Sequence, residues 1–314
     1  MSTSTAERGV EAYLAAARSR VDAVLERWGE RAGALFDDAV AGAVRYALLS
    51  AGKRLRPTLV FAAYEALGGS HGAIAELGAA VEVVHAYSLV HDDLPCMDND
   101  DLRRGRPTVH RAFDVPTATR AGFQMVGLAA RVLADGCEAL GLEPARRRAV
   151  ALELFRAAGA GGMIGGQVLD LEGEGRRLPV ADLYDVHRRK TGALIAAACV
   201  IGGLAAGEGG GGGGGGGAPP GHVAALRAYG EAIGLAFQIA DDVLDATGTS
   251  AQLGKTAGRD AVLAKSTFVT LLGVGAARAE AERRAAQAVD HLREAGLASP
   301  VLVALAHYIV TRPK

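Results

Sequence analysis

The feature that most constrains the fold is a helical pattern that runs through nearly the whole chain. Alanine and leucine dominate, proline is scarce, and alternating β-branched residues are almost absent. The segment 278–292 mixes charges with alanine at helical spacing, and 77–90 is apolar apart from Glu82 and His85. Half of the 314 residues are hydrophobic, enough for a large core. These patterns predict one all-α domain over residues 1–314.

Two segments need separate interpretation. Nine consecutive glycines occupy 209–217. Because glycine loses the most entropy on ordering, we expect a flexible surface loop at about 207–221, between two helices of the same domain. The uncharged segment 192–206 has 15 residues, fewer than the roughly 20 that span a bilayer. A buried helix is therefore expected there.

Composition excludes several classes of protein. Lys and Arg number 34 against 35 Asp and Glu, a net charge of −1, which is unlike a broadly basic nucleic-acid-binding protein. The three cysteines form neither a disulfide framework nor a CxxC metal site. The N-terminus has no signal-peptide pattern. We expect a cytoplasmic protein with no nucleic-acid partner and no stable membrane insertion.

Two clusters of aspartate each follow an apolar helical run. The members of the first aspartate motif (residues 92–98) are Asp92, Asp93 and Asp98, and those of the second (residues 241–245) are Asp241, Asp242 and Asp245. One such cluster is readily explained as a solvated surface, but two at equivalent places fit that explanation poorly. Pro95 disfavours a regular helix through the first motif, so we expect the chain to round a helix end and return Asp98 toward Asp92.

The second motif has the spacing of one helix face. Asp241 and Asp245 are four residues apart, and Gln238 lies one turn earlier. Carboxylates this close resist ionisation unless a cation balances them. Aspartate oxygens suit Mg²⁺, which keeps waters and shares its shell with substrate phosphates. The spacing therefore predicts a magnesium site.

Basic residues surround both motifs. The chain has only five lysines against 29 arginines, and four of the lysines lie in or beside polar segments. The cations near the motifs are Lys53, Arg56, Arg103, Arg104, Lys190, Lys255 and Lys265. Carboxylate pairs with scattered cations imply a substrate with several negative charges, held partly through metal. No Walker GxxxxGK[ST] element occurs, which argues against a P-loop nucleotide site.

Together these motifs resemble those of the trans-isoprenyl diphosphate synthases, the polyprenyl synthetase family, and most of all its bacterial farnesyl-forming members. In chain order they are GKRLRP, HAYSLVHDDLPCMDNDDLRRGRPT, GGQVLDL, HRRKTGALI, GLAFQIADDVLD and LGKTAGRD followed by AKSTF. The resemblance extends over essentially the whole chain. It implies an all-α isoprenoid synthase fold around a deep central cavity, usually in a homodimer.

The resemblance also implies a role for each motif. The aspartate motifs face each other and hold three Mg²⁺ ions, for which Mn²⁺ can substitute, on the diphosphate of an allylic substrate. The implied metal ligands are Asp92, Asp93, Asp98, Asp241, Asp242 and Asp245. The implied contacts of the allylic substrate are Arg103, Lys190, Thr191, Gln238 and Lys255, and those of isopentenyl diphosphate are Lys53, Arg56, His85 and Arg104. Lys265 matches a lysine near the diphosphate.

The implied reaction agrees with the residue chemistry. Ionisation of an allylic C–O bond leaves a carbocation and a highly charged diphosphate, which metal and cations stabilise. The Gln238 amide oxygen and the Lys190 or Thr191 carbonyl can face the carbocation without capturing it, and the released diphosphate can accept the proton. His85 has an alternative interpretation as a satisfied core histidine. However, it shares a helix stripe with Ser88 and Asp92, which favours the functional one.

Product length is predicted from the residues beneath the first motif. Tyr87 is an aromatic residue five positions before Asp92, and Ser88 lies one turn below it. In the family, this aromatic with two extra residues inside the motif resembles the farnesyl-forming type, so a C15 product is expected. The segment PCMDNDDLRRG also resembles geranylgeranyl synthases, which leaves a C20 product open.

One departure from the family pattern bears on the alternatives. The family commonly reads Ala-Gly-Asp where this chain reads Ala121-Gly122-Phe123. The change leaves open a non-catalytic partner subunit, although such subunits tend to lose one aspartate motif and this chain keeps both. A class I terpene cyclase would have a different second metal motif. A long-chain synthase would favour a small residue at position 87.

Overall fold

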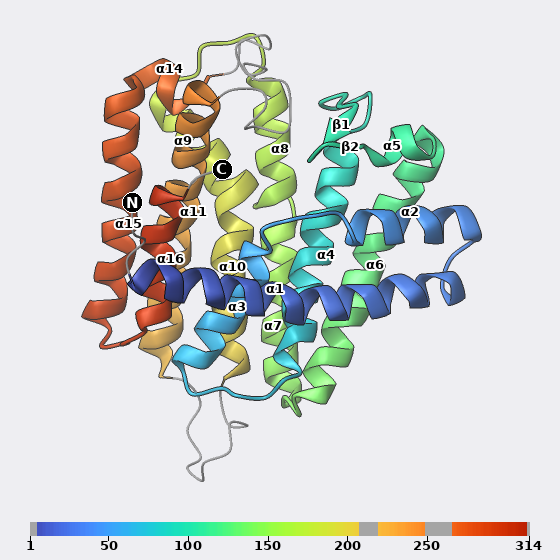
Figure 1. Ribbon diagram of the computed structural model, residues 1–314, viewed down its shortest axis with the longest axis horizontal. Helices are drawn as coiled ribbons and strands as arrows, with labels where there is room; N and C mark the ends of the chain where they lie inside the picture. The colour runs from blue at the N-terminus through green and yellow to red at the C-terminus, as the bar shows by residue number, and fades with distance from the viewer. Residues whose placement is uncertain (1–4, 207–218, 249–265, 313–314) are drawn as a thin grey trace.

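The computed structural model describes residues 5–206, 219–248 and 266–312 and is almost entirely helical (Figure 1). The helices before residue 140 are α1 (Thr5–Arg31), the 3₁₀ turn η1 (Ala32–Ala34), α2 (Asp38–Leu48), α3 (Leu55–Ala66), α4 (Ile74–Asp92), α5 (Val109–Ala112) and α6 (Val115–Ala139). The helices after it are α7 (Pro144–Ala158), α8 (Met163–Glu172), α9 (Val180–His187), the π-helical turn η2 (Arg188–Gly192), α10 (Ala193–Ala205), α11 (Pro220–Thr247), α14 (Phe268–Leu272), α15 (Val274–Glu294) and α16 (Pro300–Thr311). The all-α prediction is confirmed.

Within the described residues, strands occur in one two-residue hairpin. Its strands β1 (Leu102–Arg103) and β2 (Arg106–Pro107) are antiparallel. Arg104 and Gly105 connect them, both with positive φ (54° and 76°). Positive φ at both central positions is what a tight two-residue hairpin turn requires. The hairpin therefore places two consecutive arginines directly after the first aspartate motif.

Several helices begin where the sequence supplies a cap. Asp37 accepts a hydrogen bond from the Val40 backbone N–H at the start of α2. Asp114 caps α6 in the same way, and Ser299 caps α16. These side chains satisfy backbone donors that lack a partner inside the helix. Proline follows the cap of both α6 and α16, where its missing N–H costs nothing.

The core is centred on α10, whose sequence is the uncharged segment singled out above. Nearly all of its side chains are buried, among them Leu194, Ile195 and Val200. The helix packs between α3 and α11, with α7 also against it. The expectation of a buried helix here is confirmed. Among the residues that the structure describes, no helix combines the length and the hydropathy that crossing a bilayer demands.

The motifs collect at one end of this bundle. Helices α4 and α11 both finish at the upper end in Figure 1, and η2 opens α10 at the same end. The hairpin of β1 and β2 lies there too, beside the end of α4. The glycine run at 209–217 lies outside the described residues, so the predicted flexible loop stays a prediction.

Candidate active site

The first aspartate motif rounds the end of a helix, as its proline predicts. Helix α4 ends at Asp92, and Asp93 is its C-cap residue. The Asp98 backbone N–H then donates to the Asp92 carbonyl oxygen at 2.8 Å, and the Asp100 N–H donates to Asp93 at 3.1 Å. The chain thus turns back on itself, and this prediction is confirmed.

The Asp92 carboxyl lies in an environment that disfavours its charge. Burial raises the pKa of Asp92 to about 6, and the neighbouring Asp98 and Asp93 charges act in the same direction. Lys190 opposes them through its positive charge. A nearby multivalent cation would restore the ionised form. Asp92 and Asp98 are therefore placed as the clustered carboxylates that the sequence predicts.

Asp93 has a different partner. Its side chain is almost fully buried and accepts two hydrogen bonds from the Arg103 Nε, at 2.8 and 2.9 Å, and one from the Arg103 Nη2. Asp100 lies 3.6 Å from the same guanidinium. Burial raises the pKa of Asp93, and Arg103 acts against that rise. The first motif therefore ties the hairpin to the end of α4 through an ion pair.

The second aspartate motif lies inside α11. Arg312, which follows α16, donates from its Nη2 to Asp241 Oδ1 and stacks over the Phe237 ring at 4.1 Å. Asp242 is buried and accepts the Phe268 backbone N–H at 2.9 Å and the Gln238 amide at 3.3 Å. Asp245 follows one turn after Asp241 on the same helix. The predicted helical face is confirmed.

Lys190 and Thr191 lie in the π-helical turn η2, where the helical hydrogen-bond pattern is interrupted. Such turns are common at functional sites. The Thr191 hydroxyl donates to Gln238 Oε1 at 3.0 Å, so the structure brings these two candidate site residues together. Lys190 Nζ binds Asp170 at 2.7 Å. Gly166 permits the packing of α8, because a Cβ there would meet the Lys190 backbone N at 2.1 Å.

Basic side chains gather around His85, on the same stripe of α4 as Ser88 and Asp92. Burial lowers the pKa of His85 well below its usual value, and the charges of Arg56 and Arg104 add to the effect. Burial also lowers the pKa of Arg56 to about 10, and its Nε has no hydrogen-bond partner. Arg104 donates to the Ala51 carbonyl. This concentration of positive charge is suited to an anion.

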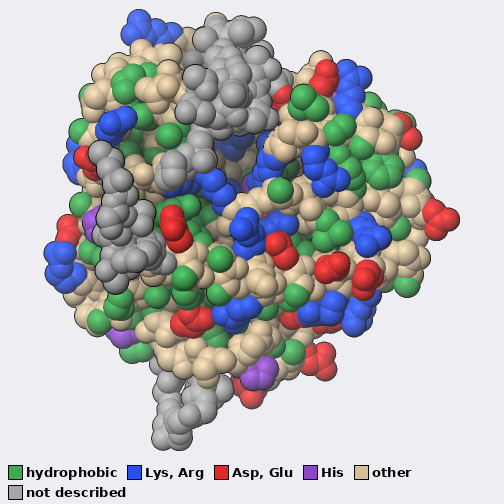
Figure 2. Space-filling model, in the orientation of Figure 1, with side chains coloured by type: hydrophobic (Ala, Val, Ile, Leu, Met, Phe, Trp, Pro, Cys, Tyr) green, Lys and Arg blue, Asp and Glu red, His purple; other side chains and the backbone are tan. Residues whose placement is uncertain are grey.

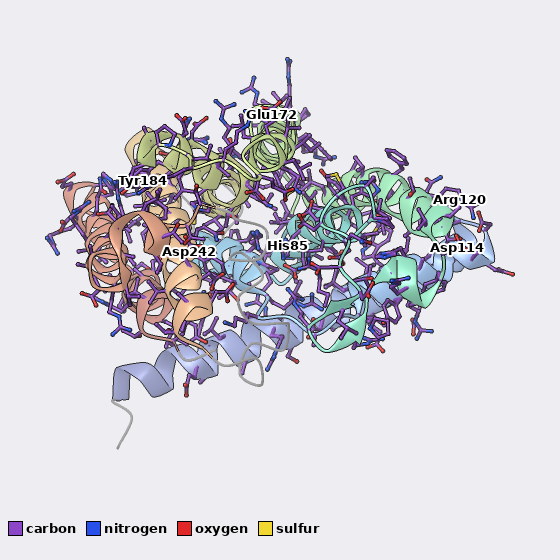
Figure 3. The ribbon with its side chains drawn as sticks, turned by 90° about the horizontal axis from the view of Figure 1, so that it is seen from above. His85, Asp114, Arg120, Glu172, Tyr184 and Asp242 are labelled. Carbon is purple, nitrogen blue, oxygen red and sulfur yellow. The ribbon has the colours of Figure 1, made fainter. Side chains whose placement is uncertain are left out.

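The charged groups surround one region of the surface. Figure 2 shows Lys and Arg side chains around the upper middle of the face that is turned toward the viewer. In Figure 3, His85 lies near the centre of the molecule, with Asp242 to one side and Asp114 and Arg120 far to the other. Lys53 is exposed at the start of the same segment as Arg56. Lys255 and Lys265 lie outside the described residues, so nothing tests their predicted roles.

An apolar cavity of about 290 Å³ extends below Asp92. Its walls come from α4, α8 and η2. Its lining includes Tyr87, Ser88, His91, Gln167, Lys190 and Thr191. Tyr87 is buried, and that burial, with the Asp92 charge, raises its pKa to about 12. The cavity opens onto the first motif, since Asp92 also lines it.

Sequence reasoning missed several residues of this site. Gln167 is buried in the cavity wall, and both polar atoms of its amide have no hydrogen-bond partner. Asp170, one turn later on α8, orients Lys190. Both lie in the GGQVLDL segment, whose i, i+3 spacing of two polar residues in an apolar helix was the available signal. Arg54, which binds Glu82 at 2.9 Å, gave no such signal.

The acidic residues do not form a closed metal cage. Across residues 5–206, 219–248 and 266–312, no three His, Cys, Asp or Glu side chains meet as a metal-binding group. Mg²⁺ sites commonly take one or two carboxylates per ion and complete the shell with water and phosphate. The donor set around Asp92 and Asp241 fits that type of site, since Asp92 gains from a cation nearby.

Comparisons with known proteins agree with this geometry. The chain is 44% identical over 278 residues to farnesyl diphosphate synthase of Escherichia coli K12, covering 88% of this chain and 90% of that protein. It is 40% identical to the large subunit 1 of a chloroplastic heterodimeric geranylgeranyl pyrophosphate synthase of Arabidopsis thaliana, covering 86% of this chain and 71% of that protein.

Solved structures give the same result. The geranyltransferase of Helicobacter pylori, crystallised with magnesium and isoprenyl diphosphate, superposes with a TM-score of 0.78 at 28% identity, covering 99% of this chain and 98% of that one. The sequence model of the polyprenyl synthetases matches residues 37–297. The chain therefore belongs to the polyprenyl synthetase family.

Proposed function

We propose that this protein is a trans-prenyltransferase that condenses isopentenyl diphosphate with dimethylallyl and geranyl diphosphate to give farnesyl diphosphate. The observation that carries the proposal is that Asp92 of the first motif lines an apolar cavity together with Arg56 and Lys190, while the charge of Asp241 in the second motif acts on Arg56. The 44% identity to a farnesyl diphosphate synthase supports it. The charged mouth would bind diphosphate, and the cavity would take the hydrocarbon chain.

Mg²⁺ is the metal used in this family, and three ions are expected here, with Mn²⁺ as a substitute. We propose that Asp92, Asp98, Asp241 and Asp245 hold the ions directly. When bound, Mg²⁺ acts as a Lewis acid that stabilises the diphosphate leaving group. Asp93 and Asp242 belong to the same motifs, but their side chains are buried, unlike those of Asp92 and Asp241, and accept hydrogen bonds from Arg103 and the Phe268 N–H. Their role would be to hold each motif in place.

The cations divide into two sets. Arg103 and Lys190, with Lys255, would bind the diphosphate of the allylic substrate. The residues assigned to isopentenyl diphosphate are Lys53, Arg56, His85 and Arg104. His85 stays neutral in this basic environment, so it can donate one hydrogen bond to a phosphate oxygen without adding charge. Lys265 would assist near the allylic diphosphate.

The carbocation would form next to neutral dipoles. Thr191, which lines the cavity, and Asp242 hold the Gln238 amide, so its oxygen would be a neutral dipole near the carbocation and not a nucleophile. The Lys190 and Thr191 carbonyls lie in the π turn beside it. The apolar cavity would exclude water, which would otherwise trap the cation. The proton lost after condensation would go to the released diphosphate.

Tyr87 and Ser88 are proposed to set product length. Both line the cavity, and Tyr87 is the larger and the more deeply buried. We expect Tyr87→Ala to lengthen the product beyond C15, with Tyr87→Phe as a matched control that keeps the ring. An unchanged product distribution in Tyr87→Ala would contradict this role.

A C20 product of the wild type is the second candidate, since a geranylgeranyl pyrophosphate synthase subunit is 40% identical.

We also propose a cytoplasmic homodimer. Large hydrophobic side chains are exposed on α6 and α8, where Phe123, Ile164 and Val168 lie about half in solvent or more. An exposed apolar surface of this kind is suited to association. The chain has a mass of 32.1 kDa, and light scattering of the purified protein would give twice that mass if the proposal holds.

The function is tested with the purified chain alone. It is incubated with isopentenyl diphosphate and dimethylallyl or geranyl diphosphate, with Mg²⁺ or with EDTA, and the dephosphorylated products are separated by chromatography. Metal-dependent farnesol is expected. Geranylgeraniol would keep the reaction but move the product to C20. No product under any condition would contradict an independent enzyme and favour a partner subunit.

A further inference from the structure

Three rings lie in a row from the cavity to the surface. Tyr87 and His91 line the cavity on α4, with ring centroids 6.1 Å apart in an edge-on arrangement. The Phe123 ring of α6 meets the far side of His91 at 5.2 Å, again edge-on. Helices α4 and α6 run side by side along their length (Figure 1). The cavity wall is therefore backed by a ring from a second helix.

The His91 ring is seated on α6 by three successive contacts. Its Nε2 lies 3.1 Å from the Thr119 carbonyl oxygen, and since a carbonyl only accepts, Nε2 carries the proton. The ring lies directly over Gly122, where a Cβ would come within 2.0 Å of Nε2. Phe123 closes the remaining side. Only the Phe123 contact comes from a side chain on α6.

Burial within the single chain does not explain the place of Phe123. The side chain is 67% exposed, the highest exposure among the large hydrophobic residues that the structure describes. Its contact with His91 is thus an aromatic edge contact, the geometry that the ring quadrupoles favour. The family's more common aspartate could not make this contact, and its carboxylate would attract the imidazole N–H instead. The substitution at this position therefore changes how His91 is held.

We propose that Phe123 is a positioning residue for product length, which it limits by holding the His91 ring against the cavity beside Tyr87. The proposal rests on the proposed prenyl transfer at this site. Without the Phe123 ring, His91 can move toward α6 into the vacated space, and the cavity lengthens on that side. The growing chain would then accept a further isopentenyl unit before it is released.

The test compares four variants of the full chain. Phe123→Ala and Phe123→Leu remove the ring, and Phe123→Leu keeps most of its volume if the alanine variant folds poorly. Phe123→Tyr is the conservative rescue. Val126→Ala, which changes another exposed residue of α6, is the matched control. Products from isopentenyl and dimethylallyl diphosphate are separated by length, and light scattering checks that each variant keeps the wild-type mass.

Phe123→Ala and Phe123→Leu should raise the ratio of longer products to the wild-type product by about threefold to tenfold. This is the range expected for losing one aromatic contact. The tyrosine and Val126 variants should keep the wild-type ratio. An active Phe123→Leu enzyme with the wild-type product ratio would overturn the proposal.

A second measurement does not depend on turnover. The imidazole signals of His91, assigned by comparison with His91→Gln, are recorded by NMR. They should shift in Phe123→Leu and stay in place in Val126→Ala. Unmoved signals would overturn the proposal. If the wild type makes no prenyl product while these signals shift, the proposed function fails but the seating of His91 by Phe123 stands.

Discussion

The two aspartate motifs share a sequence pattern but differ in backbone. In the first, α4 ends and the chain turns back, so that the Asp98 N–H meets the Asp92 carbonyl at 2.8 Å. In the second, α11 continues to Thr247, and the helix itself aligns Asp241 with Asp245. The six-residue spacing from Asp92 to Asp98 needs the turn, whereas the four-residue spacing needs only a helix.

The motifs also differ in what holds their second aspartate. Asp93 is bound by the charged Arg103 side chain, and Asp242 by the neutral Phe268 N–H and the Gln238 amide. In both motifs, the buried aspartate lies behind a more exposed one. The comparison indicates that the paired aspartates divide the work between holding the motif and binding metal, and that the two motifs achieve this with different partners.

The largest expected effect is on turnover. Asp92→Asn and Asp241→Asn each remove one carboxylate charge from the proposed metal site. We expect kcat to fall by about 10²–10³-fold in each, the scale of losing one charge-stabilising group. Steady-state assays with geranyl diphosphate measure this. Asp101→Asn is the control, because Asp101 is exposed and pairs with Arg111. Near-wild-type turnover in Asp92→Asn would contradict the assignment of Asp92 to metal binding in the first motif.

Acid should test the surroundings of the second motif. His187 Nε2 lies 3.9 Å from Asp242 Oδ2. Burial lowers the pKa of His187 to about 4. The unfolded chain takes up this proton near pH 6.5, the folded chain only near pH 4. The unfolded state therefore binds more protons in this window, and the free energy of unfolding falls as the pH falls, by up to about 3 kcal/mol.

Urea unfolding of the wild type and His187→Asn between pH 7 and pH 4 isolates this contribution. In His187→Asn, the free energy of unfolding should fall less steeply as the pH falls. His307→Asn, at an exposed position, should keep the wild-type pH dependence. Equal slopes in the wild type and His187→Asn would show that the second motif carries no buried neutral histidine.

The inner aspartates should differ in their cost to stability. Asp93→Asn removes the charged partner of Arg103, which is about one third exposed, so we expect a loss of about 2 kcal/mol. Asp242→Asn keeps an oxygen for the Phe268 N–H, and the loss should be nearer 1 kcal/mol. Urea unfolding at pH 7 measures both. The reverse order would contradict the assignment of an ion pair to the first motif and neutral hydrogen bonds to the second.

The smallest effect is expected at Arg312. Its side chain is buried over Phe237 and binds Asp241, which is 36% exposed. Arg312→Gln should lower the free energy of unfolding by about 1 kcal/mol, through the lost ring contact and ion pair. Arg293→Gln, which breaks an exposed pair with Asp290, is the control and should change little. Equal changes in the free energy of unfolding for Arg312→Gln and Arg293→Gln would mean that the contact of Arg312 with Asp241 does not stabilise the second motif.

The sequence predicted the fold and the outline of the site for identifiable reasons. Helical periodicity and the uncharged run at 192–206 are local signals, and α4 and α10 lie where they indicate. Pro95 and the spacing of Asp92 and Asp98 predicted the turn of the first motif. The family resemblance implied Thr191 and Gln238 as separate substrate contacts, and the structure adds that they are hydrogen-bonded to each other at 3.0 Å.

Long-range contacts were beyond sequence reasoning. The partner of Asp93 is a residue ten positions later whose approach depends on the positive φ of Arg104. Asp241 is bound by Arg312, 71 residues away, which no local pattern relates to it. The backing of His91 by Phe123 requires α4 and α6 to pack side by side. Such contacts depend on packing between helices, which single-sequence patterns do not encode.

The most direct test of the divided motifs is stabilisation by Mg²⁺ with inorganic diphosphate, measured by thermal unfolding of the wild type, Asp92→Asn and Asp93→Asn. A ligand that binds only the folded state raises its unfolding temperature. We predict that Asp93→Asn begins lower but gains the wild-type increase, whereas Asp92→Asn begins near the wild type and gains much less. A full increase in Asp92→Asn together with its loss in Asp93→Asn would contradict the account.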